Sequence, residues 1–161
     1  MLQLLLLRHG KAVKYQDDTT DFNRRLNKEG TAQVNQVGFI LRGQGKRVGQ
    51  IISSGAVRTT ETAEIVNHFL KLPKIEFDND LYLADKTTIL HKLCTQGRSE
   101  ILLYVGHNNG ISDLAGYLTG KEILMSTGEL VTLEFNSDDW KMVTGHSGRL
   151  VSRLVPDIHS F

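Results

Sequence analysis

The chain has 161 residues, of which 40% are hydrophobic, and its 19 Lys and Arg residues against 18 Asp and Glu residues give a formal charge of +1. A chain of this length forms one domain that buries about two-thirds of its unfolded surface, so we expect a single domain over residues 1–161. The small net charge creates no global field for nucleic acid or a membrane surface, and neither partner is expected. The single cysteine, Cys94, excludes an internal disulfide and suits the reducing cytoplasm, where we expect the protein to reside.

The chain opens on an apolar run, Leu2 to Leu7, that stops abruptly at Arg8, His9 and Gly10. Such a run is too short to span a membrane, and it predicts a strand buried on both faces of a sheet. Ligands bind outside the carboxyl ends of strands in open α/β sheets, so Arg8 and His9 should face a crevice. Gly10 would allow a tight turn and leave room for a ligand.

An Arg-His pair in this position suits phosphoryl transfer. That reaction needs a nucleophile in line with the leaving group and fixed positive charge around the equatorial oxygens. A neutral imidazole nitrogen of His9 can attack phosphorus, and the Arg8 guanidinium disfavours the protonated form of that ring. The tripeptide alone is equally compatible with a solvent-exposed histidine after an edge strand.

A helix should follow the polar loop of residues 11–25. Asn27 has the properties of its N-cap, and Glu29 would lie in the first turn, close to the positive end of the helix dipole. An apolar stripe at helical spacing is formed by Val34, Val37, Ile40 and Leu41. The glycines at positions 43 and 45 should end this helix.

Residues 48–52 predict the next strand, and residues 56–70 a helix with Arg58 in its first turn. The amides of a helix N-terminus attract anions, so Arg58 would add positive charge to a phosphate site. On spacing alone, an ion pair of Arg58 with Glu61 or Glu64 on the helix surface explains the residue equally well.

The alternation continues to the end of the chain. His107, like His9, follows an apolar strand-like run, and a second strand that ends in histidine favours one shared site over two structural histidines. Alternating strands and helices predict a three-layer α/β/α sandwich with a mostly parallel central sheet, here with antiparallel edge strands. The remaining predicted strands are 75–77, 100–105, 128–135, 140–144 and 149–155, and the remaining helices are 86–93 and 111–118.

Three segments, residues 4–10, 53–63 and 105–110, together resemble the histidine phosphatase superfamily, whose Arg-His-Gly signature carries a phosphorylated histidine. Residues 21–30 and the small size are most similar to its SixA-type phosphohistidine phosphatase branch. The resemblance implies a phosphoglycerate mutase-like fold and His9 as the nucleophile. It implies that the phosphoryl oxygens are bound by Arg8, Arg58 and His107. Further candidate substrate-binding residues are Arg24, Ser54 and Asn108.

The sequence departs from this family at the proton donor. Many members carry a glutamate here, but no glutamate lies between Glu76 and Glu100. Asp85 is the nearest substitute, with Asp80 and Tyr82 as further candidates. As an alternative, Asp85 would be an N-terminal carboxylate of the helix over residues 86–93. A protonated imidazole leaves more readily than an alkoxide, so a phosphohistidine substrate lessens the need for a carboxylic acid.

Two loop positions near the second histidine also bear on the site. The family commonly has a proline where this chain has Asn109, which leaves Asn108 and Asn109 as candidate hydrogen-bond donors to substrate. The pair Thr127 and Gly128 resembles a Thr-Gly pair of the small phosphatases and is expected to close one wall of the site.

The predicted function is hydrolysis of protein phosphohistidine through a covalent intermediate on His9, by a monomer that needs no cofactor. The remaining histidines lack metal-ligand spacing, so no metal is expected. The partner would be a phosphorylated protein, such as a histidine phosphotransfer domain. Two alternatives stay open: a phosphatase for small phosphate esters or other phosphoproteins, and a catalytically weak module that binds phosphate.

Overall fold

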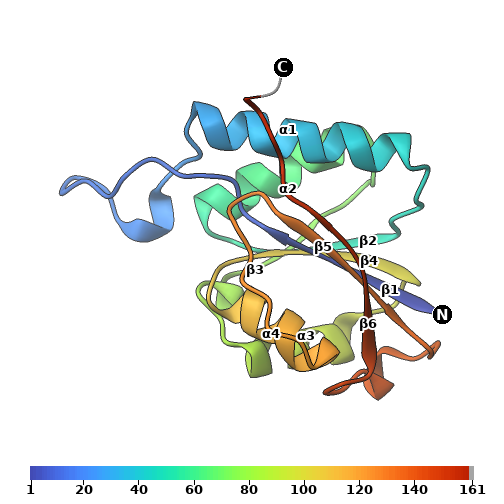
Figure 1. The fold of residues 1–161 in the computed structure, drawn as a ribbon. Coiled ribbons are helices and arrows are strands. Elements are labelled where there is room, and N and C mark those ends of the chain that lie inside the picture. Colours follow the sequence, from blue (N-terminus) through green and yellow to red (C-terminus); the bar gives the residue numbers. More distant parts are fainter. Residues whose placement is uncertain (160–161) are drawn as a thin grey trace.

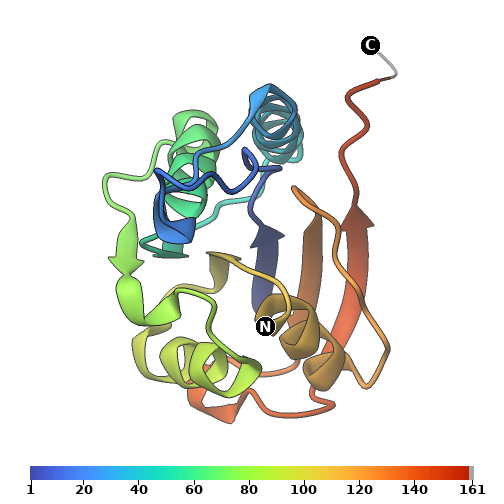
Figure 2. The ribbon, with the colours of Figure 1, turned by 90° about the vertical axis from the view of Figure 1, so that its left-hand side faces the viewer.

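The computed structural model describes residues 1–159, which are organised around a six-stranded sheet with strand order β3-β2-β4-β1-β5-β6. The strands β1 to β4 run parallel to one another, whereas β5 is antiparallel to β1 and β6 is antiparallel to β5. Figure 2 shows β3 and β6 at opposite edges of this sheet. The predicted sheet, mostly parallel with antiparallel strands at one edge, is confirmed. The strands are β1 Leu2–Arg8, β2 Gln50–Ser54, β3 Glu76–Asp78, β4 Ile101–Gly106, β5 Leu130–Phe135 and β6 Gly148–Leu154.

Helices cover both faces of the sheet, which confirms the three-layer α/β/α arrangement. Figure 1 shows α1 and α2 on one face and α3 and α4 on the other. Three short 3-10 helices, η1 to η3, lie in the connections. The bounds are α1 Lys28–Gly43, α2 Val57–Leu70, α3 Lys86–Gln96, α4 Gly110–Thr119, η1 Asp21–Asn23, η2 Asn79–Leu81 and η3 Trp140–Met142.

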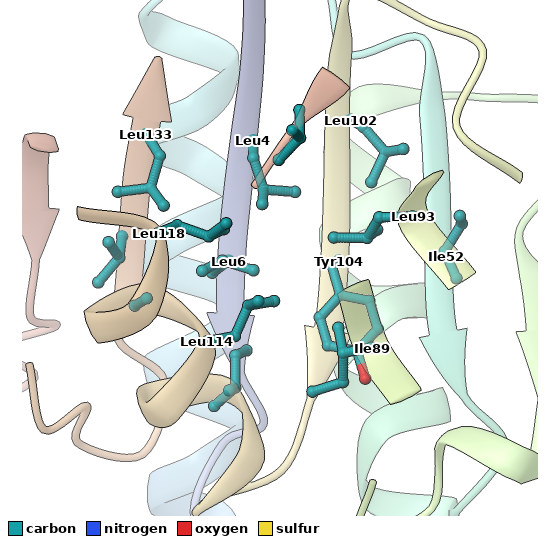
Figure 3. Close-up of a cluster of buried hydrophobic side chains, with 14 of the residues drawn as sticks. Leu4, Leu6, Ile52, Ile89, Leu93, Leu102, Tyr104, Leu114, Leu118 and Leu133 are labelled. Atoms are coloured by element: carbon teal, nitrogen blue, oxygen red, sulfur yellow. The ribbon is translucent and has the colours of Figure 1, made fainter. Parts of the chain in front are cut away.

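The leucine run of β1 is continuous because each face of this central strand meets a different helical layer. Leu4 and Leu6 pack toward α3 and α4, as Figure 3 shows, and Leu5 and Leu7 pack toward α1 and α2. All four side chains are fully buried. Burial of each side chain contributes about 1.5–3 kcal/mol to the stability of the fold relative to an exposed position. The strand β1 therefore holds the residues that follow it in a fixed position.

The helix α1 begins as its sequence predicts. The Asn27 side chain accepts a hydrogen bond from the Gly30 amide at 2.8 Å, and the helix ends at Gly43. Two residues later Gly45 has a φ of +68°, a conformation that glycine adopts without steric cost.

One predicted strand, over residues 140–144, is wrong. The segment forms η3, in which the Asp139 side chain accepts a hydrogen bond from the Lys141 amide at 3.0 Å. Trp140 and Val143 are buried three residues apart, the spacing of a helical turn rather than of a strand. The Trp140 indole also donates to the Ser99 carbonyl at 2.8 Å, which anchors η3 to the segment just before β4.

The strands β1, β2 and β4 are neighbours and end at the same edge of the sheet. Arg8 of β1 is opposite Gly106 of β4, and Ser53 of β2 is opposite Val105. This register brings His9, Ser54 and His107 to one place. Among residues 1–159, no helix is both long and apolar enough to cross a membrane.

Candidate active site

His9 lies immediately after β1 and is only 7% exposed. Its Nδ1 is 2.7 Å from the Gly10 carbonyl, and because a carbonyl only accepts, Nδ1 carries the proton. The lone pair of Nε2 is therefore available, and it accepts a hydrogen bond from Arg58 Nε at 3.3 Å. Burial lowers the pKa of His9 to about 4, and the charges of Arg58, Arg8 and Arg24 add to this effect. The ring is a neutral base with its nucleophilic nitrogen directed at a guanidinium.

Arg58, in the first turn of α2, is 2% exposed and points into the site. Besides its bond to His9, its Nη1 donates to the Asp21 carbonyl at 2.7 Å, and its Nη2 pairs with the Asp21 carboxylate at 3.1 Å. Glu61 instead pairs with Arg25 and accepts a hydrogen bond from the Leu26 amide. The structure therefore favours the inward orientation over the surface pairing with Glu61.

His107 follows β4, and its ring centroid is 5.4 Å from that of His9. The two histidines, 98 positions apart in the chain, are within reach of one phosphoryl group. Burial lowers the pKa of His107 to about 3, with further lowering by His9 and Arg58. The Ser54 hydroxyl lies 2.8 Å from Nε2 of His107 and accepts a hydrogen bond from the Ala56 amide. Ser54 thus orients His107.

Two buried nitrogen atoms in this site lack a hydrogen-bond partner within the described part of the chain: Nε of Arg8 and Nδ1 of His107. Arg8 is held in place by a hydrogen bond from Nη1 to the Met125 carbonyl at 2.8 Å. Buried polar atoms are nearly always paired, and an unpaired one calls for an explanation. An oxyanion in front of His9 would accept hydrogen bonds from both nitrogens.

Three partly exposed side chains surround the buried histidines: Asp21 of η1, Arg24 just after it, and Tyr82 just after η2. Arg24 Nε donates to Asp21 at 2.9 Å, and the Tyr82 hydroxyl donates to the same carboxylate. The Tyr82 ring packs edge-on against Phe22, with centroids 5.0 Å apart, and against His107. The hydrogen bond from Tyr82, with those from the two arginines, lowers the pKa of Asp21 to about 2. The site therefore has three guanidiniums and one carboxylate, two positive charges in excess.

Asp21 is the residue of this group that the sequence analysis missed. It was part of the segment that resembles the SixA-type branch, but no local pattern distinguishes it from Asp17 and Asp18 in the same loop. Arg24, in contrast, was predicted and lies within this group.

Two other predicted site residues have structural partners instead. Asp85 is exposed, and its carboxylate accepts a hydrogen bond from the Thr88 amide at 2.9 Å, so it is the N-cap of α3. This is the capping role that the sequence left open as the alternative to proton donation by Asp85. The Asn108 amide donates to the Met125 carbonyl and accepts from the Ser112 hydroxyl, which ties the loop after β4 to the segment near Met125.

The backbone around His9 is supported from two sides. The Gly128 amide donates to the carbonyls of Arg8 and His9, at 3.1 and 2.9 Å, so the predicted Thr-Gly pair packs directly behind the site. A Cβ on Gly10 would lie 2.6 Å from the Gly30 carbonyl oxygen of α1. Gly10 is thus needed for close packing against α1, which differs from the predicted reason of a tight turn beside a ligand.

Comparisons of sequence relate the chain to a known family. The sequence profile of the histidine phosphatase superfamily (branch 1) matches residues 4–82. An uncharacterised chloroplastic protein of Arabidopsis thaliana is 29% identical over a 176-residue alignment that covers 99% of this chain and 80% of the plant protein.

Two solved structures have a similar fold over nearly the whole chain. A protein of Agrobacterium tumefaciens assigned to the SixA phosphohistidine phosphatases has a TM-score of 0.84 and 23% identity, covering 96% of this chain and 98% of its own. The protein histidine phosphatase SixA complexed with tungstate has a TM-score of 0.80 and 20% identity, covering 96% and 97%. The profile match over residues 4–82 makes the chain similar to the histidine phosphatase superfamily, and the two solved structures show that it has the mixed α/β fold of the SixA phosphohistidine phosphatases.

Proposed function

We propose that this protein is a phosphohistidine phosphatase, which removes phosphoryl groups from phosphohistidine in proteins through a covalent intermediate on His9. The observation that carries the proposal is the state of His9. Its Nδ1 proton is held by the Gly10 carbonyl, and its Nε2 lone pair faces Arg58. A neutral, oriented imidazole beside fixed positive charge is suited to attack a phosphoryl group.

In the first step His9 Nε2 attacks phosphorus while the bond from phosphorus to the substrate nitrogen breaks. The substrate ring is protonated on its other nitrogen, so it takes back the electron pair of the broken bond and leaves as neutral imidazole. Arg8, Arg58 and His107 would bind the equatorial oxygens, where charge is spread in the transition state. The unpaired nitrogens of Arg8 and His107 support this assignment.

In the second step water attacks the phosphoryl group on His9. The bond between Nε2 and phosphorus breaks, and its electron pair returns to the ring. The protons of the water stay on the departing phosphate. Neither step requires a metal ion. Arg24 lies close enough to lower the pKa of His9 and would add to the positive field.

The acid–base properties of the site favour phosphohistidine over an alkyl phosphate ester. The departing oxygen of such an ester needs a proton, but Asp21, His9 and His107 have pKa values of about 2, 4 and 3 and are deprotonated near neutral pH. Burial raises the pKa of Tyr82 above its ordinary value, so its hydroxyl is a weak acid. A protonated phosphohistidine ring supplies its own proton.

The proposed partner is a phosphorylated protein, with a histidine phosphotransfer domain as the first candidate, and the proposed enzyme is a cytoplasmic monomer. The test is turnover of a phosphohistidine peptide compared with p-nitrophenyl phosphate. We expect a higher kcat/KM for the peptide, and a label from the phosphorylated peptide that is trapped on His9 by an alkaline quench. Turnover of p-nitrophenyl phosphate alone would indicate a phosphatase for esters. Phosphate binding without turnover of either would indicate a binding module.

A further inference from the structure

Within residues 1–159, Asp21 is the one carboxylate that contacts Arg58, and its position differs from that of the buried residues of the site. His9, Arg58 and His107 are at most 7% exposed, whereas the Asp21 side chain is 38% exposed. In phosphoryl transfer the attacking and leaving atoms lie on opposite sides of phosphorus. Because the nucleophile His9 is buried, the leaving group must lie on the outer side of the site, where Asp21 is.

Three side chains hold the Asp21 carboxylate on this outer side of the site. Arg24 binds one oxygen, and Arg58 and the Tyr82 hydroxyl bind the other. The Arg58 guanidinium that pairs with Asp21 also donates to His9 Nε2. One guanidinium therefore bridges the nucleophilic nitrogen and the carboxylate, so a group that leaves on the outer side of phosphorus would depart near Asp21.

The charge state of Asp21 determines what it can do there. Its titratable and charged neighbours are Tyr82, Arg24, Arg58 and the imidazole of His107. The hydrogen bonds from Tyr82, Arg24 and Arg58 keep it ionised at neutral pH. An ionised carboxylate cannot donate a proton to a leaving group, but it accepts hydrogen bonds strongly, particularly from a cation. It also repels a leaving group that acquires negative charge.

We propose that Asp21 selects the substrate by the chemistry of its leaving group. Its carboxylate accepts a hydrogen bond from the distal N–H of the phosphorylated imidazole, which stabilises the protonated ring that leaves as neutral imidazole. It disfavours leaving groups that depart as anions. This inference rests on the proposed function and deepens it, because it assigns the preference for a nitrogen base to a particular residue.

With Asp21 in this role, the bonds and protons of the first displacement step balance as before. The nitrogen–phosphorus bond of the substrate breaks, its electron pair returns to the ring nitrogen, and the proton on the distal nitrogen stays on the ring. Asp21 neither gains nor loses a proton. It acts by stabilising the protonated form of the substrate.

The test compares Asp21→Asn with the wild type on a phosphohistidine peptide and on p-nitrophenyl phosphate, which leaves as an anion. We expect kcat/KM for the peptide to fall about 10- to 100-fold, the range of a lost charged hydrogen bond. For p-nitrophenyl phosphate it should stay the same or rise, because the repulsion is removed. The alkaline limb of the kcat–pH profile for the peptide should move to lower pH in the variant.

Two further variants make this result specific. Asp18→Asn removes a charge from an exposed position in the same loop and should leave the ratio of the two substrates within about twofold of wild type. Asp21→Glu keeps the charge and should retain most of the preference for the peptide. Circular dichroism of each variant verifies folding, and if Asp21→Asn does not fold, Asp21→Glu must still favour the peptide.

An equal fall for both substrates in Asp21→Asn would overturn the inference, since Asp21 would then only support Arg58. An equal rise for both would also overturn it, since the carboxylate would only compete with the phosphoryl group for Arg58. The proposed function is tested separately by the wild type: if it leaves the phosphohistidine peptide intact, the function and this inference both fall. If the wild type is active and the ratio does not change in Asp21→Asn, only the inference falls.

Discussion

The site has two regions that are built in different ways. The floor, defined as His9, Arg58 and His107, comes from the ends of β1 and β4 and the first turn of α2. The rim, defined as Asp21, Arg24 and Tyr82, comes from irregular segments beside η1 and η2; the loop between β1 and α1 extends away from the sheet before it returns (Figure 1). Regular elements position the floor, and hydrogen bonds between side chains position the rim.

In the proposed mechanism, this difference separates chemistry from selection. The floor is buried and neutral at its two imidazoles, so it would provide the nucleophile and the oxyanion ligands. The rim is partly exposed and charged, so it would meet the part of the substrate that leaves. Changes to the floor should therefore affect the rate with every substrate, whereas changes to the rim should affect some substrates more than others.

The largest effect is expected at the nucleophile. His9→Ala removes the only atom that forms the covalent bond, and we expect a loss of at least about 10⁴-fold in kcat for every substrate. Steady-state rates with the phosphohistidine peptide and p-nitrophenyl phosphate measure it. Retention of near wild-type activity would refute the assignment of His9.

A smaller but still large loss is expected for Arg58→Ala. Removal of this guanidinium takes away a donor to the transferring group, and comparable changes cost about 10²–10⁴-fold in kcat. The loss should be similar for both substrates, as befits a floor residue. If only the peptide were affected, Arg58 would belong functionally to the rim.

Acid should destabilise the floor before it affects the rim. The pKa values of His9 and His107 are about 4 and 3 in the folded protein, below the usual value of about 6.5 in the unfolded chain. Between about pH 6.5 and 4 the unfolded chain binds more protons, so the free energy of unfolding falls as pH falls. Its slope should be on the order of 1.4 kcal/mol per histidine per pH unit. The stability that comes from the lowered pKa of Asp21 is lost only below about pH 4.

Urea denaturation at several pH values measures this slope. His107→Gln should remove about half of the change between pH 6.5 and 4.5, because one of the two buried histidines is gone. An unchanged slope in this variant would mean that other groups control the acid sensitivity.

The smallest effect is expected for Arg24→Ala in the rim. Arg24 is partly exposed and bonds to Asp21 and to the Val13 carbonyl, so its loss loosens the rim and leaves the floor intact. We expect a fall in kcat/KM of about tenfold or less with the peptide, and a smaller change with p-nitrophenyl phosphate. A loss as large as that of Arg58→Ala would place Arg24 in the floor.

The floor could be predicted from the sequence because each of its residues follows a strong local signal. The unbroken apolar runs before His9 and His107 indicate buried parallel strands, and the ends of such strands meet at one edge. Arg58 could be placed in the first turn of a helix, but its pairing could not be decided. The inward direction of Arg58 follows from its contacts with His9 and Asp21, which lie 49 and 37 positions away.

Other features have no unique local signal. An aspartate before a helix is equally suited to capping and to proton donation, and only the structure assigns Asp85 to the cap of α3. The spacing of Trp140 and Val143 was compatible with a short strand until their shared burial was known.

By itself, the sequence determined the order of most strands and helices, the layered α/β/α fold and the two histidines and one arginine of the floor, because patterns of burial and helix capping act over a few neighbouring residues. The tertiary structure alone decided the place of Asp21 in the rim and the contacts that join the rim residues. Asp21 meets Tyr82 across 61 positions of chain, and such a contact depends on how two irregular loops fold over the sheet. Hydrogen bonds between distant loops leave no periodic trace in a sequence, and in this protein they hold the only carboxylate that contacts the guanidinium of Arg58 within residues 1–159.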